Sequence, residues 1–477
     1  MDPSDFKRHG YALVDWIADY LEHSARYPVL AQVAPGDVTR ALPAAAPERA
    51  ESFDAIFADF ERVLVPALTH WNHPGFFAYF AITASAPGVL AEFLAAALNQ
   101  QAMLWRTSPA ATELEAVTLG WLRQLLGLPE PFEGVIYDTA SISTLHALAA
   151  ARQTAVAGVR EHGLAGRGGI GRVRVYCSEH AHSSVDKALI LLGLGLASLR
   201  RIPADDQHRL RADLLRAAIE ADIADGLRPV AVVATIGTTS STSVDPIAEV
   251  AAICRAHGIW LHVDAAYAGV TAMVPECRAL MDGWELADSI VLNPHKWLFV
   301  PFDLSVLYCR RMDVIRETFS VTPAILRTAE ADRGVRNLMD TGIQLGRRFR
   351  ALKLWMVLRH FGAQGVRDAL VEHMRLARLF AIWIDADPMF ERTAPVPFSV
   401  VCFRAKPDGM TGEALDRFNE VLVDRLNAGG EVFLSHTRLN DSTVIRLAIG
   451  NLQTTEQHVG LAFSLLRTHT AQLLALP

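Results

Sequence analysis

Short β-rich runs that alternate with helical stretches constrain the fold of this chain more than any other feature of its sequence. The runs are Val135-Ile136-Tyr137, Val173-Arg174-Val175-Tyr176, Val230-Ala231-Val232-Val233, Trp260-Leu261-His262-Val263 and Ile290-Val291-Leu292. Strands and helices in this order build βαβ units, and such units produce a mostly parallel sheet. We therefore expect a large α/β domain over residues 86–360, with a ligand at the carboxyl ends of its strands.

Residues 245–249 predict a helix start inside this domain. Asp245-Pro246 precedes Ile247-Ala248-Glu249, and aspartate suits the N-cap position while proline suits the first helical position. We expect the side chain of Asp245 to cap this helix.

The two flanking segments have different patterns. Residues 5–25 carry apolar side chains at helical spacing, and a Pro/Ala-rich stretch from Pro35 to Pro47 follows. Residues 1–85 are therefore expected to form a helical arm that is too thin to fold alone and that packs either on its own domain or on a second subunit. Strand-like runs at 398–403 and 444–449 flank a helical pattern at 414–427. They predict a small C-terminal α+β domain over residues 361–477.

Composition argues against several function classes. Hydrophobic residues make up 51% of the chain and charged residues 20%, which is typical of a globular protein. A net charge of -7 attracts neither nucleic-acid phosphates nor anionic lipid, so we expect no nucleic acid and no membrane as partner. The five cysteines are widely spaced, and the acidic N-terminus lacks an apolar signal-peptide core. These features predict a soluble protein of the reducing cytoplasm.

The segment Asn293-Pro294-His295-Lys296-Trp297 is the strongest chemical signal, because it directly follows the apolar run Ser289–Leu292. Burial lowers the pKa of a lysine, and a neutral amine can attack an aldehyde to form a Schiff base. From the flanking residues alone, a lysine that extends its ammonium group to solvent is an equally good interpretation.

Two further strand ends carry polar groups. Asp264 follows Trp260–Val263 and precedes the small residues Ala265-Ala266, and a carboxylate there can keep the ring nitrogen of a pyridine cofactor protonated. Asp138-Thr139-Ala140-Ser141 joins a strand to a helix, and the N–H groups of a helix start bind phosphate. The second signal is weak by itself, because small polar residues cap most helices.

Together with His180-Ala181-His182-Ser183-Ser184 and Gly237-Thr238-Thr239, these segments resemble the pyridoxal 5′-phosphate (PLP)-dependent decarboxylases of group II. That family includes the aromatic-L-amino-acid, histidine and glutamate decarboxylases, and the aromatic branch is the most similar. The resemblance runs from Asp5-Phe6 through 73–80 and 345–350 to the C-terminal domain. It implies the PLP-dependent transferase fold of the aspartate aminotransferase type (fold type I). It also implies a homodimer with shared active sites, in which the N-terminal arm wraps the partner.

The resemblance also implies a role for each matching cofactor residue and no metal ion. Lys296 binds the PLP aldehyde, Asp264 pairs with the pyridine nitrogen, and His182 stacks on the ring. The remaining cofactor residues are Ala140, Ser141 and Asn293 around the phosphate, Thr239 and His295 beside the cofactor, and Ala266 on the ring face opposite His182. Lys296, His182, Asp264 and Thr239 are the expected catalytic residues.

The implied substrate pocket has aromatic walls. Its residues are Trp71, Tyr79, Phe80, Met103 and Leu338. Such walls favour a flat apolar side chain, because an acidic one would need a buried cation. We therefore expect decarboxylation of an aromatic L-amino acid to its amine and CO2.

Two positions depart from the family pattern. Relatives usually have a tyrosine after the Asp or Asn of the loop that covers the site, whereas Asn337 is followed by Leu338 here. Leucine cannot donate a proton, and relatives without the tyrosine can let O2 react, which yields an aldehyde, ammonia and peroxide. Aldehyde synthesis is thus the alternative reaction, unless His182 or a water molecule supplies the proton. Arg106 replaces a usually small residue, and it predicts either an ion pair or a more acidic substrate.

Two other classes stay open at this point. A metal hydrolase could use His180, His182, His262, Asp264 and His295, although no known ligand spacing supports it. The second class is a protein that binds PLP but catalyses no reaction, because Leu338 stands where the family usually has its proton donor.

Overall fold

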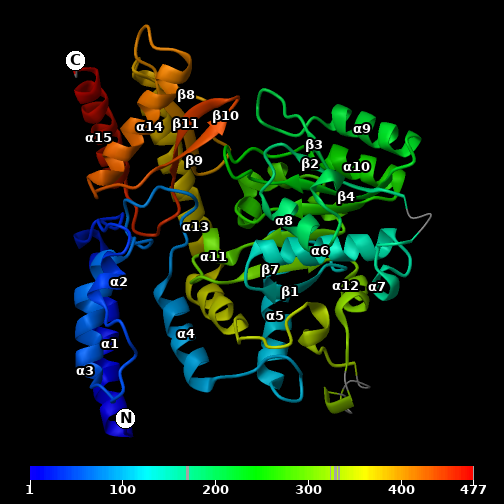
Figure 1. Ribbon diagram of the computed structural model, residues 1–477, viewed down its shortest axis with the longest axis horizontal. Coiled ribbons are helices and arrows are strands. Elements are labelled where there is room, and N and C mark those ends of the chain that lie inside the picture. The colour runs from blue at the N-terminus through cyan, green and yellow to red at the C-terminus, as the bar shows by residue number, and fades with distance from the viewer. Residues whose placement is uncertain (168–170, 323, 327–329, 331–333, 476–477) are drawn as a thin grey trace. The chain divides into compact units, whose positions relative to one another are not determined.

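The computed structural model describes residues 1–167, 171–322, 324–326, 330 and 334–475 (Figure 1). The chain divides into two compact units, which are described separately. Unit 1 comprises Met1–Thr83, His373–Thr393 and Ser399–Pro477, and unit 2 comprises Ala84–Glu372 and Ala394–Phe398. Within the described ranges, we find no helix with both the length and the apolar character needed to cross a bilayer.

A seven-stranded sheet in the order β1-β7-β6-β5-β4-β2-β3 forms the centre of unit 2. Its strands are β1 Glu133–Tyr137, β2 Val173–Ser178, β3 Leu199–Ile202, β4 Arg228–Thr235, β5 Trp260–Asp264, β6 Ser289–Leu292 and β7 Ser305–Cys309. Strands β2 to β6 pair in parallel. Strand β7 is antiparallel to both β6 and β1, so β1 runs in the same direction as β6. The predicted α/β fold with a largely parallel sheet is confirmed, and six strands end at one edge.

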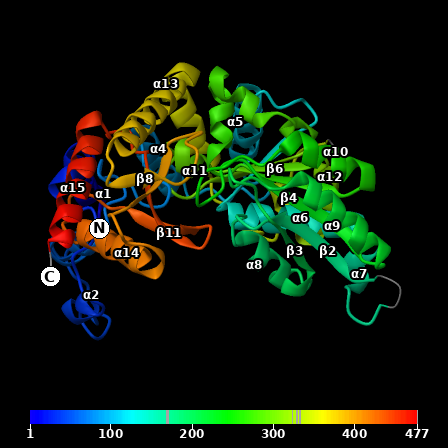
Figure 2. The same ribbon diagram turned by 90° about the horizontal axis from the view of Figure 1, so that it is seen from above.

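Helices flank this sheet or connect its strands in unit 2. They are α4 Ala86–Leu98, α5 Pro109–Leu126, α6 Ala140–Ala155, α7 Val159–His162, α8 Ser184–Leu191, α9 Ala212–Ala224, α10 Ile247–His257, α11 Pro294–Trp297 and α12 Met312–Phe319. Figure 2 shows α6 and α8 on one face of the sheet and α5 and α10 on the other. Helix α13, Ala351–Ala386, bends at Gly362 (φ 62°) and contributes residues to both units.

The apolar strand runs explain why the sheet is buried on both faces. Val233, Val263, Val291 and Leu307 are fully buried, and every residue of β5 and β6 is buried. Each such side chain contributes about 1.5–3 kcal/mol by leaving water, and a parallel sheet covered by helices needs these continuous apolar runs. The polar residues that follow the strands are thus held on a rigid edge.

Unit 1 contains the N-terminal segment and a four-stranded antiparallel sheet in the order β10-β11-β9-β8. Its elements are α1 Pro3–His23, α2 Asp37–Ala41, α3 Phe53–Asp59, β8 Phe390–Arg392, β9 Val400–Ala405, α14 Gly412–Ala428, β10 Ser435–Leu439, β11 Ser442–Ala448 and α15 Glu456–Leu474. The chain near residue 77 pairs with the C-terminal part of this unit, because Phe77 N donates to Phe433 O at 2.8 Å. Helix α1 leaves Phe6 and Tyr11 exposed, and its wrapping of a partner stays a prediction.

The predicted cap at Asp245 is wrong. Helix α10 begins at Ile247 after Pro246, and no side chain caps it. The buried carboxylate of Asp245 instead accepts hydrogen bonds from Leu210 N and Thr235 N, both at 2.8 Å. Burial raises its pKa to about 6. Asp245 therefore connects the end of β4 to the segment of Leu210 rather than capping its own helix.

Gly88 allows α4 to approach the segment that follows Lys296. A Cβ atom at Gly88 would lie 2.2 Å from Cδ of Pro301, whereas one at the helical Gly120 of α5 would meet no atom within 4 Å. We expect Gly88→Ala to destabilise the protein by about 1–3 kcal/mol through overpacking. Gly120→Ala, the matched control, should stabilise it by roughly 0.5–1 kcal/mol. The midpoint of thermal unfolding checks both, and equal midpoints for the two variants would contradict the close contact.

Candidate active site

The carboxyl edge of the sheet in unit 2 gathers every residue that the sequence predicts to bind the cofactor. They follow the strands in this way: Ala140 and Ser141 after β1, His182 after β2, Thr239 after β4, Asp264 and Ala266 at the end of β5, and Asn293, His295 and Lys296 after β6. Neighbouring strand ends lie side by side, so residues from distant parts of the sequence meet here.

Asp264 ends β5 and is only 6% exposed. Its Oδ1 accepts a hydrogen bond from Ala266 N at 3.0 Å, and among the described residues no cationic side chain forms an ion pair with it. A buried carboxylate without a counter-charge is costly. A ligand with a cationic N–H group would pair with this carboxylate, and the protonated ring nitrogen of PLP is such a group. This corner of the site therefore fits the cofactor.

His182 lies within electrostatic reach of both Asp264 and Lys296. The pKa of His182 is lowered, chiefly because surrounding protein desolvates the imidazole; Asp264 opposes this shift and Lys296 adds to it. The ring still has an exposed face in the single chain. Its Nδ1 accepts a hydrogen bond from Ser184 N at 3.1 Å, so in the neutral ring Nε2 carries the proton.

The turn after β6 places Lys296 by backbone bonds and a proline. Pro294 occupies the first position of α11, where its missing N–H costs nothing. Lys296 N donates to Asn293 O at 2.9 Å, and Asn293 N donates to Ala266 O at 3.0 Å. The buried amide of Asn293 has one end without a hydrogen-bond partner in the described part of the chain. Since amide O and N positions are interchangeable assignments, this end can donate to a phosphate.

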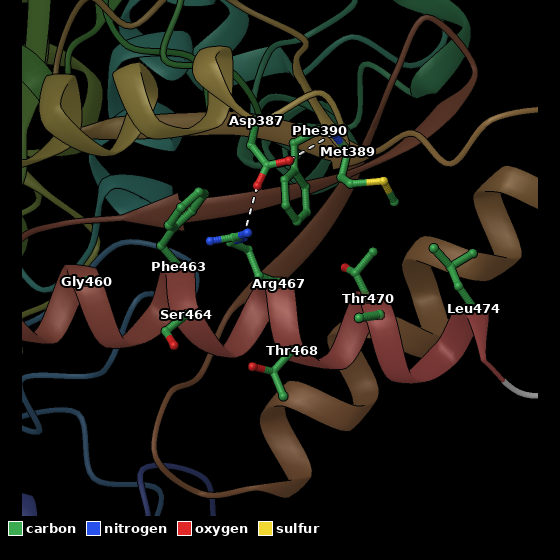
Figure 3. A pocket seen from close by; sticks show the side chains of 11 residues that line it. Asp387, Met389, Phe390, Gly460, Phe463, Ser464, Arg467, Thr468, Thr470 and Leu474 are labelled. Carbon is green, nitrogen blue, oxygen red and sulfur yellow. Dashed lines mark hydrogen bonds and ion pairs between the residues drawn. The ribbon is translucent and has the colours of Figure 1, made fainter.

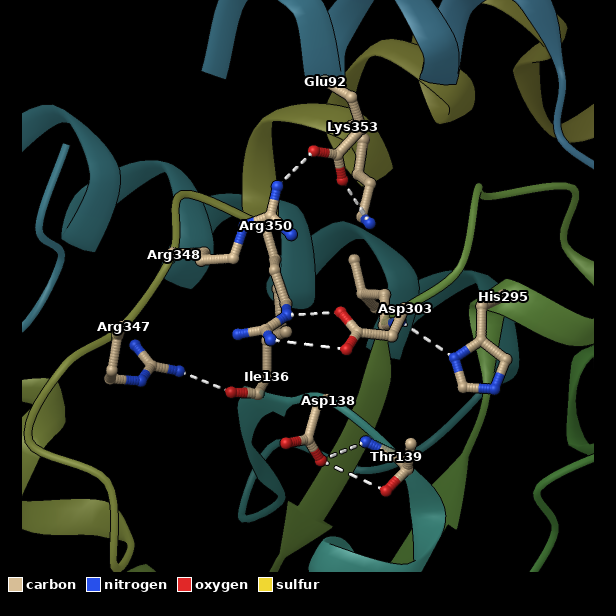
Figure 4. A network of polar contacts seen from close by, with 11 residues as sticks. Glu92, Ile136, Asp138, Thr139, His295, Asp303, Arg347, Arg348, Arg350 and Lys353 are labelled. Carbon is tan, nitrogen blue, oxygen red and sulfur yellow. Dashed lines mark hydrogen bonds and ion pairs between the residues drawn. The ribbon is translucent and has the colours of Figure 1, made fainter. Parts of the chain in front are cut away.

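His295 is buried beside Lys296 and is neutral. Its pKa falls to about 3, first because of burial and then because of Lys296. Its Nδ1 accepts a hydrogen bond from Leu304 N at 2.9 Å, which leaves the proton on Nε2. Figure 4 shows the neighbouring ion pairs, in which Arg350 contacts Asp303 at 2.8 Å, and Lys353 and Arg348 contact Glu92. Asp303 is next to Leu304, so its pair with Arg350 anchors the loop that holds His295.

The start of α6 supplies the other candidate phosphate contact. Ala140 and Ser141 are its first two residues, and the first N–H groups of a helix have no partner within it. Asp138 Oδ1 accepts from Thr139 N at 2.5 Å, and Ser143 Oγ lies 2.8 Å from Ser305 Oγ of β7. The helix start is therefore held in place on two sides.

Thr239 differs from the other predicted residues because its side chain is exposed. The loop that carries it turns at Gly237 (φ 86°), where a Cβ atom would lie 2.7 Å from Cβ of Ala268. Thr239 thus depends on a close glycine turn beside β5 for its position.

The predicted substrate residues form two groups, one in each unit. In unit 1 the rings of Trp71 and Tyr79 are 6.1 Å apart, and Arg446 lies over the ring of Phe80 at 5.2 Å. The sequence reasoning missed Phe433, whose ring lies 5.9 Å from that of Tyr79. No sequence signal identifies it, since it comes from a segment about 350 residues further along the chain.

In unit 2 the segments of Met103 and Leu338 are adjacent, because Met339 N donates to Met103 O at 3.1 Å. Met103 is half-buried, and Leu338 is 4% exposed. Arg106 is 62% exposed and lies 3.8 Å from Glu330. Of the two roles predicted for Arg106, an ion pair or recognition of an acidic substrate, the structure shows the ion pair.

Other parts of the molecule offer weaker candidates for a site. A cavity of about 500 Å³ in unit 1 lies against α15 and holds none of the predicted residues, and its Arg467 pairs with Asp387 at 3.1 Å (Figure 3). Among the described residues, no group of three or more His, Cys, Asp or Glu side chains has the arrangement of a metal site. The strand edge is the better candidate, because it brings together the buried carboxylate of Asp264, the amide of Asn293 and the segment of Lys296.

Comparison with known proteins identifies the family and the fold of the chain. Residues 35–406 match the family model for the pyridoxal-dependent decarboxylase conserved domain. The chain is 40% identical to the aromatic-L-amino-acid decarboxylase of Sus scrofa, over 100% of this chain and 98% of that protein. It is 38% identical to the phenylacetaldehyde synthase of Arabidopsis thaliana, over 99% and 97%. The crystal structure of Oryza sativa TDC with PLP and tryptamine superposes with a TM-score of 0.95 at 36% identity, over 99% of both chains. The expected fold type I is confirmed.

The Asp264 carboxylate gives a direct test of the cofactor fit. We expect Asp264→Asn to weaken PLP binding roughly ten- to a hundredfold, because it removes a charge-assisted hydrogen bond of about 1.5–3 kcal/mol. The measurement is an absorbance titration of cofactor-free protein with PLP. Asp288→Asn is the matched control, since Asp288 is a largely buried acid that accepts from Leu261 N at the opposite strand edge. Equal affinity in both variants would remove Asp264 from the site.

Proposed function

Because the chain belongs to the family of pyridoxal-dependent decarboxylases, we propose that it converts an aromatic L-amino acid into its amine and CO2. The enzyme is a PLP-dependent carboxy-lyase. The observation that carries the proposal is the gathering of a lysine, a buried unpaired carboxylate and a helix start at one strand edge. The aromatic substrate class is supported by relatives over the full chain length whose names are those of aromatic-amino-acid enzymes.

In this proposal the residues of the strand edge hold PLP at three points. Lys296 holds the aldehyde carbon, Asp264 accepts a hydrogen bond from the ring nitrogen, and the N–H groups of Ala140 and Ser141 bind the phosphate. When bound, PLP withdraws electrons from the bonds at the substrate Cα. Asn293 would donate a further hydrogen bond to the phosphate, and Thr239 and His295 would lie beside the cofactor.

His182 and Ala266 are proposed to enclose the ring from its two faces. Ala266 is 7% exposed and small, so a flat ring can lie against it. A neutral His182 on the other face can stack and can deliver the proton on its Nε2 toward Cα. Fixing the ring in this way fixes which substrate bond stands perpendicular to it, and so selects loss of the carboxylate.

The substrate contacts are part of the same proposal. Trp71, Tyr79, Phe80, Met103 and Leu338 would contact the amino-acid side chain. None of these side chains is charged, and Arg106 is paired with Glu330. An aromatic or other apolar side chain is therefore favoured over an acidic one.

Aldehyde formation is the second candidate reaction, and Leu338 is the observation that favours it. The relatives include a phenylacetaldehyde synthase at 38% identity. In that reaction one amino acid, one O2 and one water molecule yield an aldehyde, ammonia, CO2 and hydrogen peroxide: O2 accepts two electrons, and water supplies the aldehyde oxygen. The family assignment argues against the third alternative, a catalytically silent PLP-binding protein, which would form no product at all.

A product assay distinguishes these candidates. We expect the purified protein with PLP to release CO2 and an equimolar amine from at least one of L-tyrosine, L-DOPA, L-tryptophan and L-phenylalanine. Lys296→Ala should lose the visible cofactor band and at least a thousandfold of the rate, since no other residue is proposed to hold the aldehyde. Absence of CO2 and of oxygen uptake for all four substrates would exclude both reactions.

Two substitutions at Leu338 form the second arm of this assay. Leu338→Tyr adds a phenol, and Leu338→Phe adds nearly the same volume without the hydroxyl. We expect a higher ratio of amine to aldehyde in the tyrosine variant than in the phenylalanine variant. Equal ratios would show that the proton comes from another group.

We also propose that the enzyme is a homodimer with shared active sites in the cytoplasm. Four apolar side chains on one face of α4 are 45–55% exposed in the single chain: Leu90, Phe93, Leu94 and Leu98. Such a patch on a helix is typical of a protein interface. The five cysteines are free and buried, which suits a reducing compartment.

Sedimentation tests the dimer. We expect a mass of twice the 52.2 kDa of one chain, and a shift toward monomer in Leu94→Asp, because a charge on the α4 face would be desolvated in the interface. Ile223→Asp is the control, since Ile223 is an exposed apolar residue on α9. A monomeric parent protein would contradict the proposal.

A further inference from the structure

A short buried turn carries the position where relatives have their loop tyrosine. It spans Leu338–Thr341 in unit 2. Leu338, Met339 and Thr341 are 4%, 6% and 3% exposed. The turn is therefore packed on its own chain, and the residues that hold it there decide where Leu338 lies.

Two ring-bearing side chains fasten the end of this turn to the centre of unit 2. The hydroxyl of Tyr137, the last residue of β1, donates to Thr341 O. Ile343 N donates to Nε2 of His146, which lies on α6, at 3.3 Å. The two rings contact each other edge to face, with centroids 4.4 Å apart.

Gly342 passes between these two bonds in close contact with both rings. A Cβ atom there would lie 2.8 Å from Cε1 of His146 and 3.1 Å from Cε1 of Tyr137. The backbone at Gly342 therefore packs directly against the rings of Tyr137 and His146. The ring of Phe319, at the end of α12, closes the other side of His146 at 4.6 Å.

His146 is a fully buried, neutral hydrogen-bond acceptor. Burial lowers its pKa to about 3, and because its Nε2 accepts from Ile343, the proton lies on Nδ1. A buried acceptor of this kind keeps its bond throughout the neutral pH range.

The other end of the turn is tied to the segment of Met103. Met339 N donates to Met103 O at 3.1 Å, and Trp105 N donates to Oδ1 of Asn337 at 3.2 Å. Ser320 Oγ adds a bond to Asp340 Oδ1 at 3.0 Å. Hydrogen bonds at both ends of the turn, joined by its backbone, therefore connect Tyr137 and His146 to Met103.

We propose that Tyr137 and His146 are positioning residues for the substrate side of the active site. They fix Thr341–Ile343 and, through the turn, both Leu338 and Met103. Tyr137 lies three residues before Ala140, and His146 lies on the helix that Ala140 begins. The same two elements, β1 and α6, therefore position both the proposed phosphate contact and the proposed substrate contact. This inference rests on the proposed function.

The test compares three variants with a matched control. Tyr137→Phe removes the hydroxyl, His146→Leu removes the acceptor, and His146→Gln restores one. The control is Tyr308→Phe, because the hydroxyl of the buried Tyr308 on β7 donates to Leu119 O at 2.8 Å and does not contact the turn. The readouts are KM and kcat on the aromatic panel, the ratio of amine to aldehyde, PLP absorbance, and amide hydrogen exchange of peptides over 334–345.

We expect Tyr137→Phe and His146→Leu to raise KM roughly three- to tenfold, the change that loss of one hydrogen bond produces. Their product ratio should change, their PLP absorbance should not, and the amides of Met339 and Ile343 should exchange faster. His146→Gln should lie nearer to the parent. Tyr308→Phe should leave KM, product ratio and exchange unchanged even where its unfolding temperature falls.

Unchanged KM and exchange in Tyr137→Phe and His146→Leu, or equal changes in Tyr308→Phe, would overturn the proposal. If the parent protein consumes no aromatic amino acid, the proposed function is wrong, and this result does not by itself test the positioning role. Hydrogen exchange then decides whether the two residues fasten the turn, and equal exchange in all variants overturns that as well.

Discussion

The carboxylate of Asp264 is buried at the end of β5 without an ion-pair partner among the described residues, and the candidate site is organised around it. A charge in this position destabilises the protein by itself unless a ligand compensates it. The burial of apolar side chains offsets this cost, because β5 lies between β4 and β6 at the centre of the sheet. The rigidity of these strands then keeps the carboxylate, the lysine turn and the histidine in fixed relation.

Local sequence was sufficient for the parts of the site that follow strands directly. Asp264 comes immediately after an apolar run and Lys296 comes four residues after one, so the strand pattern and the chemistry could be inferred from the same few residues. The resemblance to a family then supplied His182 and Thr239, whose short motifs carry little information by themselves. The parallel direction of the sheet could be inferred from the alternation of strands and helices.

Contacts between distant segments could not be inferred in this way. The cap expected at Asp245 is wrong because Thr235 and Leu210, not the following helix, offer their N–H groups to it. His146 looks like one more residue of a helix in an alanine-rich stretch, and nothing near it in sequence points to Ile343. Phe433 is likewise hidden until the chain near Phe77 pairs with it. In each case tertiary packing decides the partner.

The antiparallel strand β7 affects which molecules can bind at the carboxyl edge of the sheet. Strand β7 separates β1 from β6, and neighbouring strands are about 4.8 Å apart. The helix start after β1 and the lysine turn after β6 are therefore separated by about 10 Å, twice that spacing. Inorganic phosphate or a small aldehyde reaches only one of these two points. The side chain of Lys296 covers part of this separation, so a single molecule that carries both a phosphate and a carbonyl group can contact the two points at once.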